Sequence, residues 1–501
     1  MLRQARPLED PTQPEIQGAP GPSVPSERED GDDRLDLEVR SRPELRAHSD
    51  LRVEAAGGIV LLIGAIAALI WANAPFGESY ATFWNTPLNL EIGELIHLDE
   101  SLKDFVNDAL MAVFFFVVGL EIKRELVVGE LRDPKRAALP AIAALGGMVV
   151  PALIFIAFVA GEPGEAGRGW GIPMATDIAF SVGVISLLGT RVSVGAKLFL
   201  LALAIADDIG AIVVIAIFYT TDLAIGWLAA AIIMLVVIRA AGRAGVRSMI
   251  FYVVAGIATW FFVFESGVHA TLAGVALGFL TPAAAWYSDR EYFDRASWIL
   301  SQRTMDEAAP LSTERIDEHA LHLAGVARES VAPLNRLEHA LHPWSSFLII
   351  PVFALANAGV RFADIDVGAA VTSPVSMGVA FGLVVGKIAG ISGATWLALR
   401  FNVGRLPKRT GWPQIIGLAA LAGIGFTVSL FVTELAFTDE LISDKAKIGI
   451  FIGSTVAGVI GYLLLRSSPT PQEALEASRE EMGLDSEAAS RSAPENAPDG
   501  D

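Results

Sequence analysis

Long apolar runs recur along the middle of this chain, and their length is the strongest constraint on its fold. An α-helix rises 1.5 Å per residue, so roughly 20 apolar residues cross the hydrocarbon core of a membrane, which is about 30 Å thick. The sequence therefore predicts an all-α polytopic membrane protein. About twelve transmembrane helices are expected, at approximately residues 54–73, 102–122, 138–160, 172–190, 194–218, 223–240, 248–264, 267–286, 343–360, 374–400, 412–437 and 446–466.

Composition supports a membrane environment. Of the 501 residues, 53% are hydrophobic and only 19% are charged, which is too apolar for an ordinary soluble domain. The net charge of −19 lies largely in residues 1–50 and 467–501, so we expect two disordered acidic tails around a transmembrane domain at 51–466. The chain has no cysteine, which excludes disulfides, thiolate metal sites and cysteine nucleophiles.

The charges of the loops predict the orientation of the chain, because short cytoplasmic loops are enriched in Lys and Arg. The first loop is acidic and has no basic residue before Lys103. Both termini are therefore expected to be cytoplasmic in a bacterial inner membrane. Basic residues gather after the second, fourth, sixth and tenth spans: Arg124, Arg132, Lys135, Arg136, Arg191, Arg239, Arg243, Arg247, Arg400, Arg405, Lys408 and Arg409.

Two loops have patterns of their own. Residues 82–98 alternate apolar and polar positions around an Ile-Gly turn, which predicts an extracytoplasmic hairpin. Residues 287–341 are long, mixed in charge and amphipathic, so we expect helices at the cytoplasmic surface.

Asp207 and Asp208 are adjacent acids near the middle of an otherwise apolar span. A charge at this depth costs several kcal/mol, so each needs a reason to be there. Successive helical residues point about 100° apart, and one carboxylate could bind an ion while the other meets a partner. The alternative is that one of them is simply a buried, hydrogen-bonded group.

A broken helix is predicted around Thr176 and Asp177, because Pro173 interrupts the start of their span. The freed backbone groups would then line a polar cavity. The alternative is a proline kink with Asp177 as a helix N-cap. The later span at 412–437 contains Gly423 and Gly425, but close helix packing would explain these glycines equally well.

Lys387 lies centrally in its span and is the only deep cation that the sequence indicates. It needs a carboxylate or a helix C-terminus, unless its side chain snorkels to an interface. Spans three to five and ten to twelve each have an interrupted middle helix and run in opposite orientations. Inverted repeats with two discontinuous, crossing helices are an architecture of secondary transporters.

Six motifs resemble the NhaA-type sodium/proton antiporters, in the same order along about residues 50–467. They are DALMAVFFFVVGLEIKREL (108–126), MATDIAFSVG (174–183), ALAIADDIGAI (202–212), GVHATLAG (267–274), RLEHALHPW (336–344) and GIGFTVSLF (423–431). The resemblance implies exchange of sodium or lithium ions for protons, with regulation of internal pH and sodium. It implies no soluble cofactor and no nucleic-acid partner.

The resemblance also implies roles for individual residues. Asp208 and Asp207 would form the sodium and proton site, Thr176 and Asp177 would lie at the broken helix, and Lys387 would be the cationic partner of Asp207. His269 would be linked to the pH response, and the hairpin would join a homodimer. A cytoplasmic pH-sensing cluster would comprise Glu121, Arg124, Glu125, Glu338, His339 and His342.

Three other functions remain open at this point. His319, His322, His339 and His342 could suggest a zinc site, although a titrating surface cluster is more economical. An intramembrane aspartyl protease could use Asp177 and Asp207, but the usual Gly-x-Gly-Asp context is missing. A sodium-coupled solute symporter with the same inverted-repeat plan is harder to separate from an antiporter by sequence.

Overall fold

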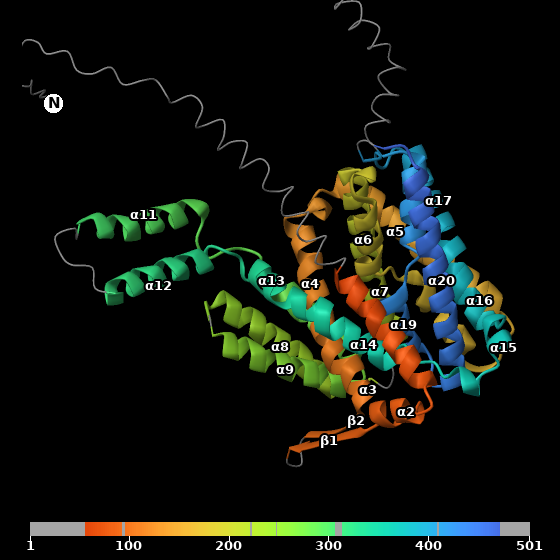
Figure 1. Ribbon diagram of the computed structural model, residues 1–501. Coiled ribbons are helices and arrows are strands. Elements are labelled where there is room, and N and C mark those ends of the chain that lie inside the picture. Colours follow the sequence, from red (N-terminus) through yellow and green to blue (C-terminus); the bar gives the residue numbers. More distant parts are fainter. Residues whose placement is uncertain are drawn as a thin grey trace, which may run out of the picture. The chain divides into compact units, whose positions relative to one another are not determined.

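Membrane-length helices make up most of the chain in the computed structural model (Figure 1), which describes residues 56–92, 96–220, 223–246, 248–305, 313–407 and 410–470. The expected acidic tails lie outside the described residues, apart from positions 467–470. Eight helical spans are long and apolar enough to cross a membrane. They are Ala56–Asn73, Leu102–Val127, α5 (Pro134–Val159), α7 (Val194–Phe218), α8 (Ile225–Arg243), Pro333–Asp364, Pro374–Arg400 and α20 (Glu440–Ser467).

Three of these spans contain a π-helical turn between two α-helices. They are α3 (Leu102–Phe105) and α4 (Met111–Val127), α13 (Pro333–Trp344) and α14 (Ile350–Asn357), and α16 (Pro374–Phe381) and α17 (Lys387–Arg400). A π-helical turn accommodates an extra residue without breaking the helix. Each span therefore remains continuous.

Two further spans are bent at a break. The 3-10 helix Gly164–Met174 meets α6 (Ile178–Leu188) at 40°, and α18 (Trp412–Leu421) meets α19 (Phe426–Ala436) at 45°. Both expected interruptions are therefore present, and the all-α polytopic fold class is confirmed. By length the described residues supply eight to ten spans, and the expected twelve would also require the shorter α9 (Met249–Glu265) and α10 (Thr271–Leu280) to cross.

The expected hairpin is present, but its first strand begins later than predicted. Strand β1 (Pro87–Ile92) pairs antiparallel with β2 (Ile96–Ser101), and residues 93–95 lie outside the described part. Residues 82–84 belong instead to helix α2 (Glu78–Trp84). The buried side chains of Tyr80 and Trp84 share one face of α2, and this packing outweighs the alternating pattern.

The long loop at 287–341 is helical where it is described, as the sequence predicts. It contains α11 (Asp289–Met305), α12 (Thr313–Glu329) and the beginning of α13. Short helical turns complete the connections at Glu130–Arg132, Gly189–Arg191, Phe362–Asp364 and α15 (Val367–Val371).

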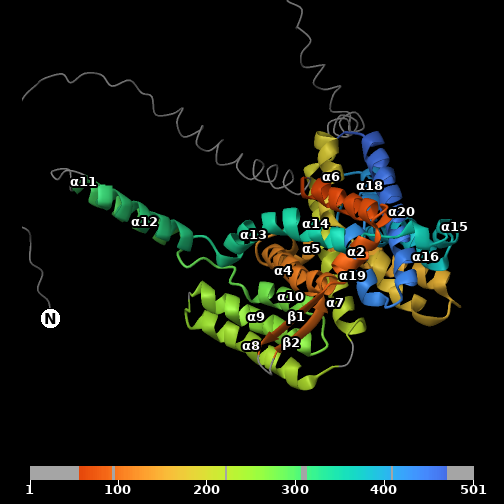
Figure 2. The ribbon, with the colours of Figure 1, turned by 60° about the horizontal axis from the view of Figure 1, so that its bottom comes forward.

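The helices pack into two groups, which Figures 1 and 2 both show side by side. The repeat bundle comprises residues 134–218 and 374–467, in which α5 packs on α7 and α17, and α20 packs on α16 and α18. The flanking bundle comprises residues 56–73, 102–127, 225–280 and 333–357, in which α4 packs on α10 and α13. The expected repeats, spans three to five and ten to twelve, together make up the repeat bundle.

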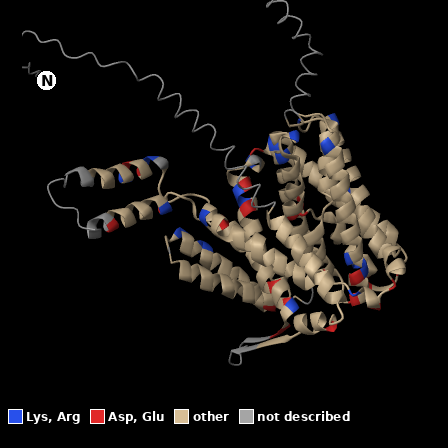
Figure 3. Cartoon of the chain, viewed as in Figure 1, with Lys and Arg blue, Asp and Glu red and all other residues tan. Residues whose placement is uncertain are grey.

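Small residues allow the helix backbones to approach closely within both bundles. A Cβ atom on Gly119 of α4 would lie 2.9 Å from the carbonyl oxygen of Val275 on α10. A Cβ atom on Gly386 would lie 2.8 Å from the Cα of Pro151 on α5. Such contacts are typical of helix association in lipid. Figure 3 shows most charged residues gathered toward the ends of the bundles, which makes charges in the interior conspicuous.

Candidate ion-binding site

The two helix breaks face each other and exchange hydrogen bonds. The backbone N–H of Asp177 donates to the carbonyl of Ile424 at 2.6 Å. The Ser181 hydroxyl donates to the carbonyl of Leu421 at 2.9 Å. Each break therefore satisfies backbone groups that the other leaves free, which is the condition for irregular backbone at membrane depth.

Asp177 fixes the junction between the two breaks. Its Oδ1 accepts from the backbone N–H of Phe180 at 3.1 Å, which makes Asp177 the N-cap of α6. Its Oδ2 accepts from both the backbone N–H and the hydroxyl of Thr427, at 3.0 and 2.6 Å. One carboxylate thus serves the positive N-terminal ends of both α6 and α19. Asp177 is therefore both a helix N-cap and part of a broken helix, so the two expected alternatives are compatible.

Lys387 and Asp207 form an ion pair in the interior of the repeat bundle. Lys387 Nζ lies 2.6 Å from Asp207 Oδ2, and neither side chain is exposed at all. Lys387 therefore does not snorkel to an interface. Asp207 Oδ1 is buried and has no hydrogen-bond partner among the described residues. The pair has one acceptor oxygen left over.

Thr176 completes this arrangement. Its Oγ1 lies 2.7 Å from Asp207 Oδ2, 2.8 Å from the carbonyl oxygen of Ala422, and 3.1 Å from Lys387 Nζ. A hydroxyl has only one proton to donate, so Thr176 can serve Asp207 or Ala422 but not both at once. At any moment one of these two oxygens therefore lacks the Thr176 proton.

Asp208 lies beside the ion pair on a different face of α7. Its side chain is half-buried, and no hydrogen bond or ion pair links it to a described residue. The carboxyl charges that act on it most strongly belong to Glu121, Asp207 and Asp177. Asp207 and Asp208 thus differ in their contacts: Asp207 is held by Lys387 and Thr176, whereas Asp208 has no such partner among the described residues.

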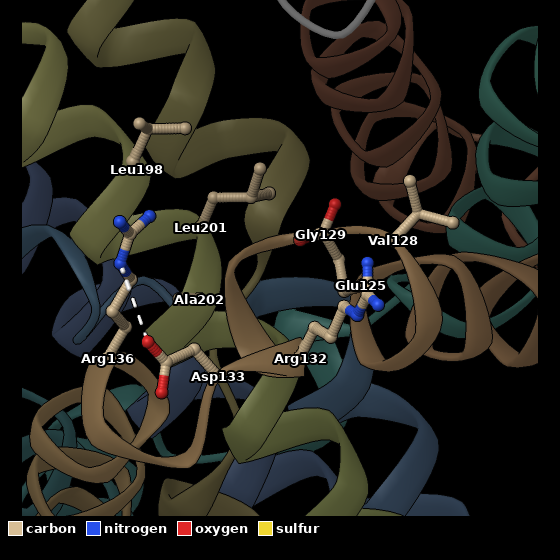
Figure 4. A pocket seen from close by; sticks show the side chains of 9 residues that line it. All are labelled: Glu125, Val128, Gly129, Arg132, Asp133, Arg136, Leu198, Leu201 and Ala202. Carbon is tan, nitrogen blue, oxygen red and sulfur yellow. Dashed lines mark ion pairs between the residues drawn. The ribbon is translucent and has the colours of Figure 1, made fainter.

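A cavity of about 530 Å³ opens toward this face of α7. Figure 4 shows Glu125, Arg132 and Arg136 around it, opposite Leu198 and Leu201 of α7. Residues seven apart lie on one helix face, so Leu201 and Asp208 point to the same side of α7, about 10 Å apart along its axis. The cavity and Asp208 therefore share that side of the helix.

The expected pH-sensing residues come partly together at the end of α4. Arg124 pairs with Glu338 of α13 and lies 3.7 Å from Glu125. Glu121 and His342 act electrostatically on Glu338, whereas His339 is exposed. His269 lies elsewhere, at the start of α10, with its Nε2 2.8 Å from the carbonyl oxygen of Tyr219. Among the described residues, no group of three or more His, Asp or Glu side chains could hold a metal such as zinc.

Sequence reasoning missed one buried charge cluster. Glu434 of α19 pairs with Lys103 of α3 at 2.6 Å and with Lys447 of α20 at 2.9 Å. Lys447 is only 4% exposed, so Lys387 is not the only buried cation among the described residues. The reason is that α20 begins at Glu440, which places Lys447 two turns inside a helix expected to start at 446. Glu434 within an apolar span was the available signal.

The geometry of the site fits an ion transporter, and comparison with known proteins identifies the family. Residues 48–465 match the family model described as Na+/H+ antiporter 1. The chain belongs to this family. It is therefore a membrane transporter and not an enzyme, which removes the aspartyl protease alternative.

Relatives of this antiporter cover most of its length. It is 45% identical over 416 residues to the Na(+)/H(+) antiporter NhaA 2 of Myxococcus xanthus, covering 83% of this chain and 88% of the relative. It is 44% identical over 433 residues to the Na(+)/H(+) antiporter NhaA of Syntrophobacter fumaroxidans, covering 84% and 91%. It is 46% identical over 421 residues to the Na(+)/H(+) antiporter NhaA of Acidithiobacillus ferrooxidans, covering 83% and 95%.

Proposed function

We propose that this antiporter exchanges Na+, or Li+, for H+ at the neighbouring carboxylates of Asp207 and Asp208. The observation that carries the proposal is the buried Oδ1 of Asp207, which has no hydrogen-bond partner among the described residues, next to the half-buried carboxylate of Asp208. Na+ is a hard cation that prefers oxygen ligands. The Thr176 hydroxyl beside Asp207 and the Ala422 carbonyl beside Thr176 add neutral oxygens of the right kind.

Competition for the same negative charge couples the two ions. In the sodium-free state the ammonium of Lys387 balances Asp207. A sodium ion bound by Asp207 and Asp208 takes over that role, so the ion pair breaks. A proton and a sodium ion both neutralise carboxylates, and a desolvated site that accommodates one expels the other. Movement of the repeats, which opens the site to one side at a time, then converts competition into exchange.

The cavity beside α7 is the proposed entrance from the cytoplasm. Its wall includes Arg132 and Arg136, from the basic loop that the positive-inside rule predicts to be cytoplasmic. The same distribution supports cytoplasmic termini in a bacterial inner membrane. In this arrangement the site faces inward, and ions reach Asp208 along the side of α7 that carries Leu201.

The pairing at the end of α4 supports a pH-responsive role for Glu121, Arg124, Glu125, Glu338, His339 and His342. Glu125 lines the cavity and also contacts Arg124, which pairs with Glu338. A change in protonation of His342 would act on Glu338 and, through Arg124, on the cavity wall. His269, bonded to the end of α7 through Tyr219, is proposed as a separate pH-linked group.

We also propose a homodimer joined through the hairpin. Strands β1 and β2 form a two-stranded sheet, so each strand has one edge with free backbone groups. Such an edge can pair with a strand of a second copy. Membrane lipid surrounds the remaining apolar surface of the spans.

Proton flux in everted membrane vesicles tests the exchange. Addition of Na+ to vesicles with a preformed proton gradient should dissipate that gradient without any organic solute, and vesicles from cells that lack the protein should show no response. Proton movement that requires both Na+ and an organic solute would identify a symporter instead.

A further inference from the structure

The cluster of Lys103, Glu434 and Lys447 has no part in the proposed ion site. The Glu434 carboxylate bridges the two lysines, with Oε2 2.6 Å from Lys103 Nζ and Oε1 2.9 Å from Lys447 Nζ. The side chains of Lys103, Glu434 and Lys447 are only 25%, 15% and 5% exposed. A pair so well shielded from water is stronger than a surface ion pair.

This cluster links the two helix bundles. Lys103 begins the second span, in the flanking bundle, whereas Glu434 and Lys447 lie on α19 and α20 of the repeat bundle. Among the described residues, the pair of Lys387 and Asp207 lies within the repeat bundle, and the pair of Arg124 and Glu338 lies within the flanking bundle. The contact of Lys103 with Glu434 must therefore break if the repeat bundle moves against its neighbour at this end.

One face of α19 connects the cluster to the ion site. Thr427, Phe431 and Glu434 follow at i, i+4 and i+7, so they lie on one face within about 10 Å. Thr427 binds Asp177 at the helix break. Phe431 packs against Phe115 of α4 and Phe353 of α14, with ring centroids 5.4 and 6.2 Å apart. Along α19, the contact of Thr427 at the helix break is thus followed by the aromatic contacts of Phe431 and then by the charge cluster at Glu434, toward the hairpin end of the molecule.

We propose that Lys103 and Glu434 form a latch that keeps the hairpin end of the ion pathway closed while the cavity at the other end is open. This latch rests on the proposed exchange, because only a transporter that opens to one side at a time needs a gate at each end of its ion pathway. Lys447 has a distinct task. It moves with Glu434, so the carboxylate keeps one cationic partner when Lys103 separates, and the opened state avoids the cost of a lone buried charge.

The substitution Lys103→Met cuts the link between the bundles and leaves Glu434 paired with Lys447. The chain has no cysteine, so Ala211→Cys provides a single reporter. Ala211 is 5% exposed, lies on α7 one turn beyond Asp207, and belongs to the apolar cluster that contains Phe431. A membrane-impermeant maleimide is applied to vesicles of each orientation, so that it reaches the reporter from one side at a time.

Labelling of the reporter from the hairpin side is expected to rise about fivefold in Lys103→Met, the factor that corresponds to roughly 1 kcal/mol. Lys103→Arg should restore the low rate. The matched control is Arg361→Met, which removes an ion pair with Asp364 at 3.2 Å within one loop and should leave labelling unchanged. If Lys103→Met does not reach the membrane, Lys103→Gln serves the same test.

Equal labelling of Lys103→Met and the parent, or an equal rise in Arg361→Met, would overturn the latch. The vesicle flux assay on the same preparations separates this result from failure of the proposed function. Sodium-dependent proton flux with unchanged labelling rejects the latch alone. Absence of sodium-dependent flux in the parent protein rejects the proposed exchange, and with it the latch, whatever the labelling.

Discussion

Lys387 Nζ lies 2.6 Å from Asp207 Oδ2 at a depth where neither side chain has any contact with solvent. Taking two charges out of water is costly, and their attraction offsets this cost only while both are present. The two charges are therefore stable in the interior only as a pair, and the proposed exchange requires a bound sodium ion to separate them.

Neutralising one member of this pair should destabilise the protein more than neutralising both. Lys387→Ala and Asp207→Asn each leave one buried charge unpaired, which typically costs about 3–5 kcal/mol. The double variant should lose less than the sum of the single losses. Thermal unfolding of the four proteins in detergent measures the coupling.

Arg361 and Asp364 provide the matched cycle at the surface, where their side chains are 36% and 59% exposed. Their coupling should be below about 1 kcal/mol. Strict additivity in the Lys387 and Asp207 cycle would argue against direct contact. The double neutral variant should also exchange fewer protons per sodium ion, or none, and wild-type coupling would leave the proton to Asp208 alone.

Asp208→Asn should abolish exchange without loss of stability. The substitution keeps the shape of the side chain, removes the charge that balances a bound cation, and breaks no hydrogen bond to a described residue. Proton flux in vesicles and thermal unfolding of the same preparation test the two halves of this prediction. Asp364→Asn, a surface substitution, should leave flux intact. Full exchange by Asp208→Asn would remove it from the site.

Shortening the hairpin should weaken dimers and leave transport measurable. The Cα atoms of Pro87 and Ser101 are paired across the sheet, so a two-residue Asn-Gly turn can replace residues 88–100. Ser101, whose side chain caps α3, is kept. Cross-linking in detergent and vesicle flux report the two effects. Wild-type dimer yield would exclude the hairpin as the main contact.

Replacing His339 and His342 by alanine should shift the pH dependence of exchange without abolishing it. His342 acts on Glu338, which pairs with Arg124 at the cavity end of α4, away from Asp207 and Asp208. The measurement is the vesicle flux rate as a function of pH. His319→Ala with His322→Ala on α12 is the control, because these histidines lie on a different helix. An unshifted profile in the first pair would count against the sensor.

Most of the long spans and the acids of the candidate site could be predicted from the sequence alone. Hydropathy is a local property, and the span at residues 194–218 matches α7 at both ends. Asp207, Asp208 and Lys387 stood out because charges are rare in apolar spans. Pro173 indicated the first break in the same way, since proline removes a backbone donor wherever it occurs.

Only the tertiary structure decided which of these groups meet. The contacts of Asp177 with Thr427 join residues 250 positions apart, and no local pattern encodes that pairing. The same holds for Lys103, whose position at the very start of the second span resembled that of an ordinary loop charge until α19 and α20 brought Glu434 and Lys447 beside it. A sequence states which side chains carry charge, but the attraction between charges depends on distance and burial, and both arise only when distant helices pack.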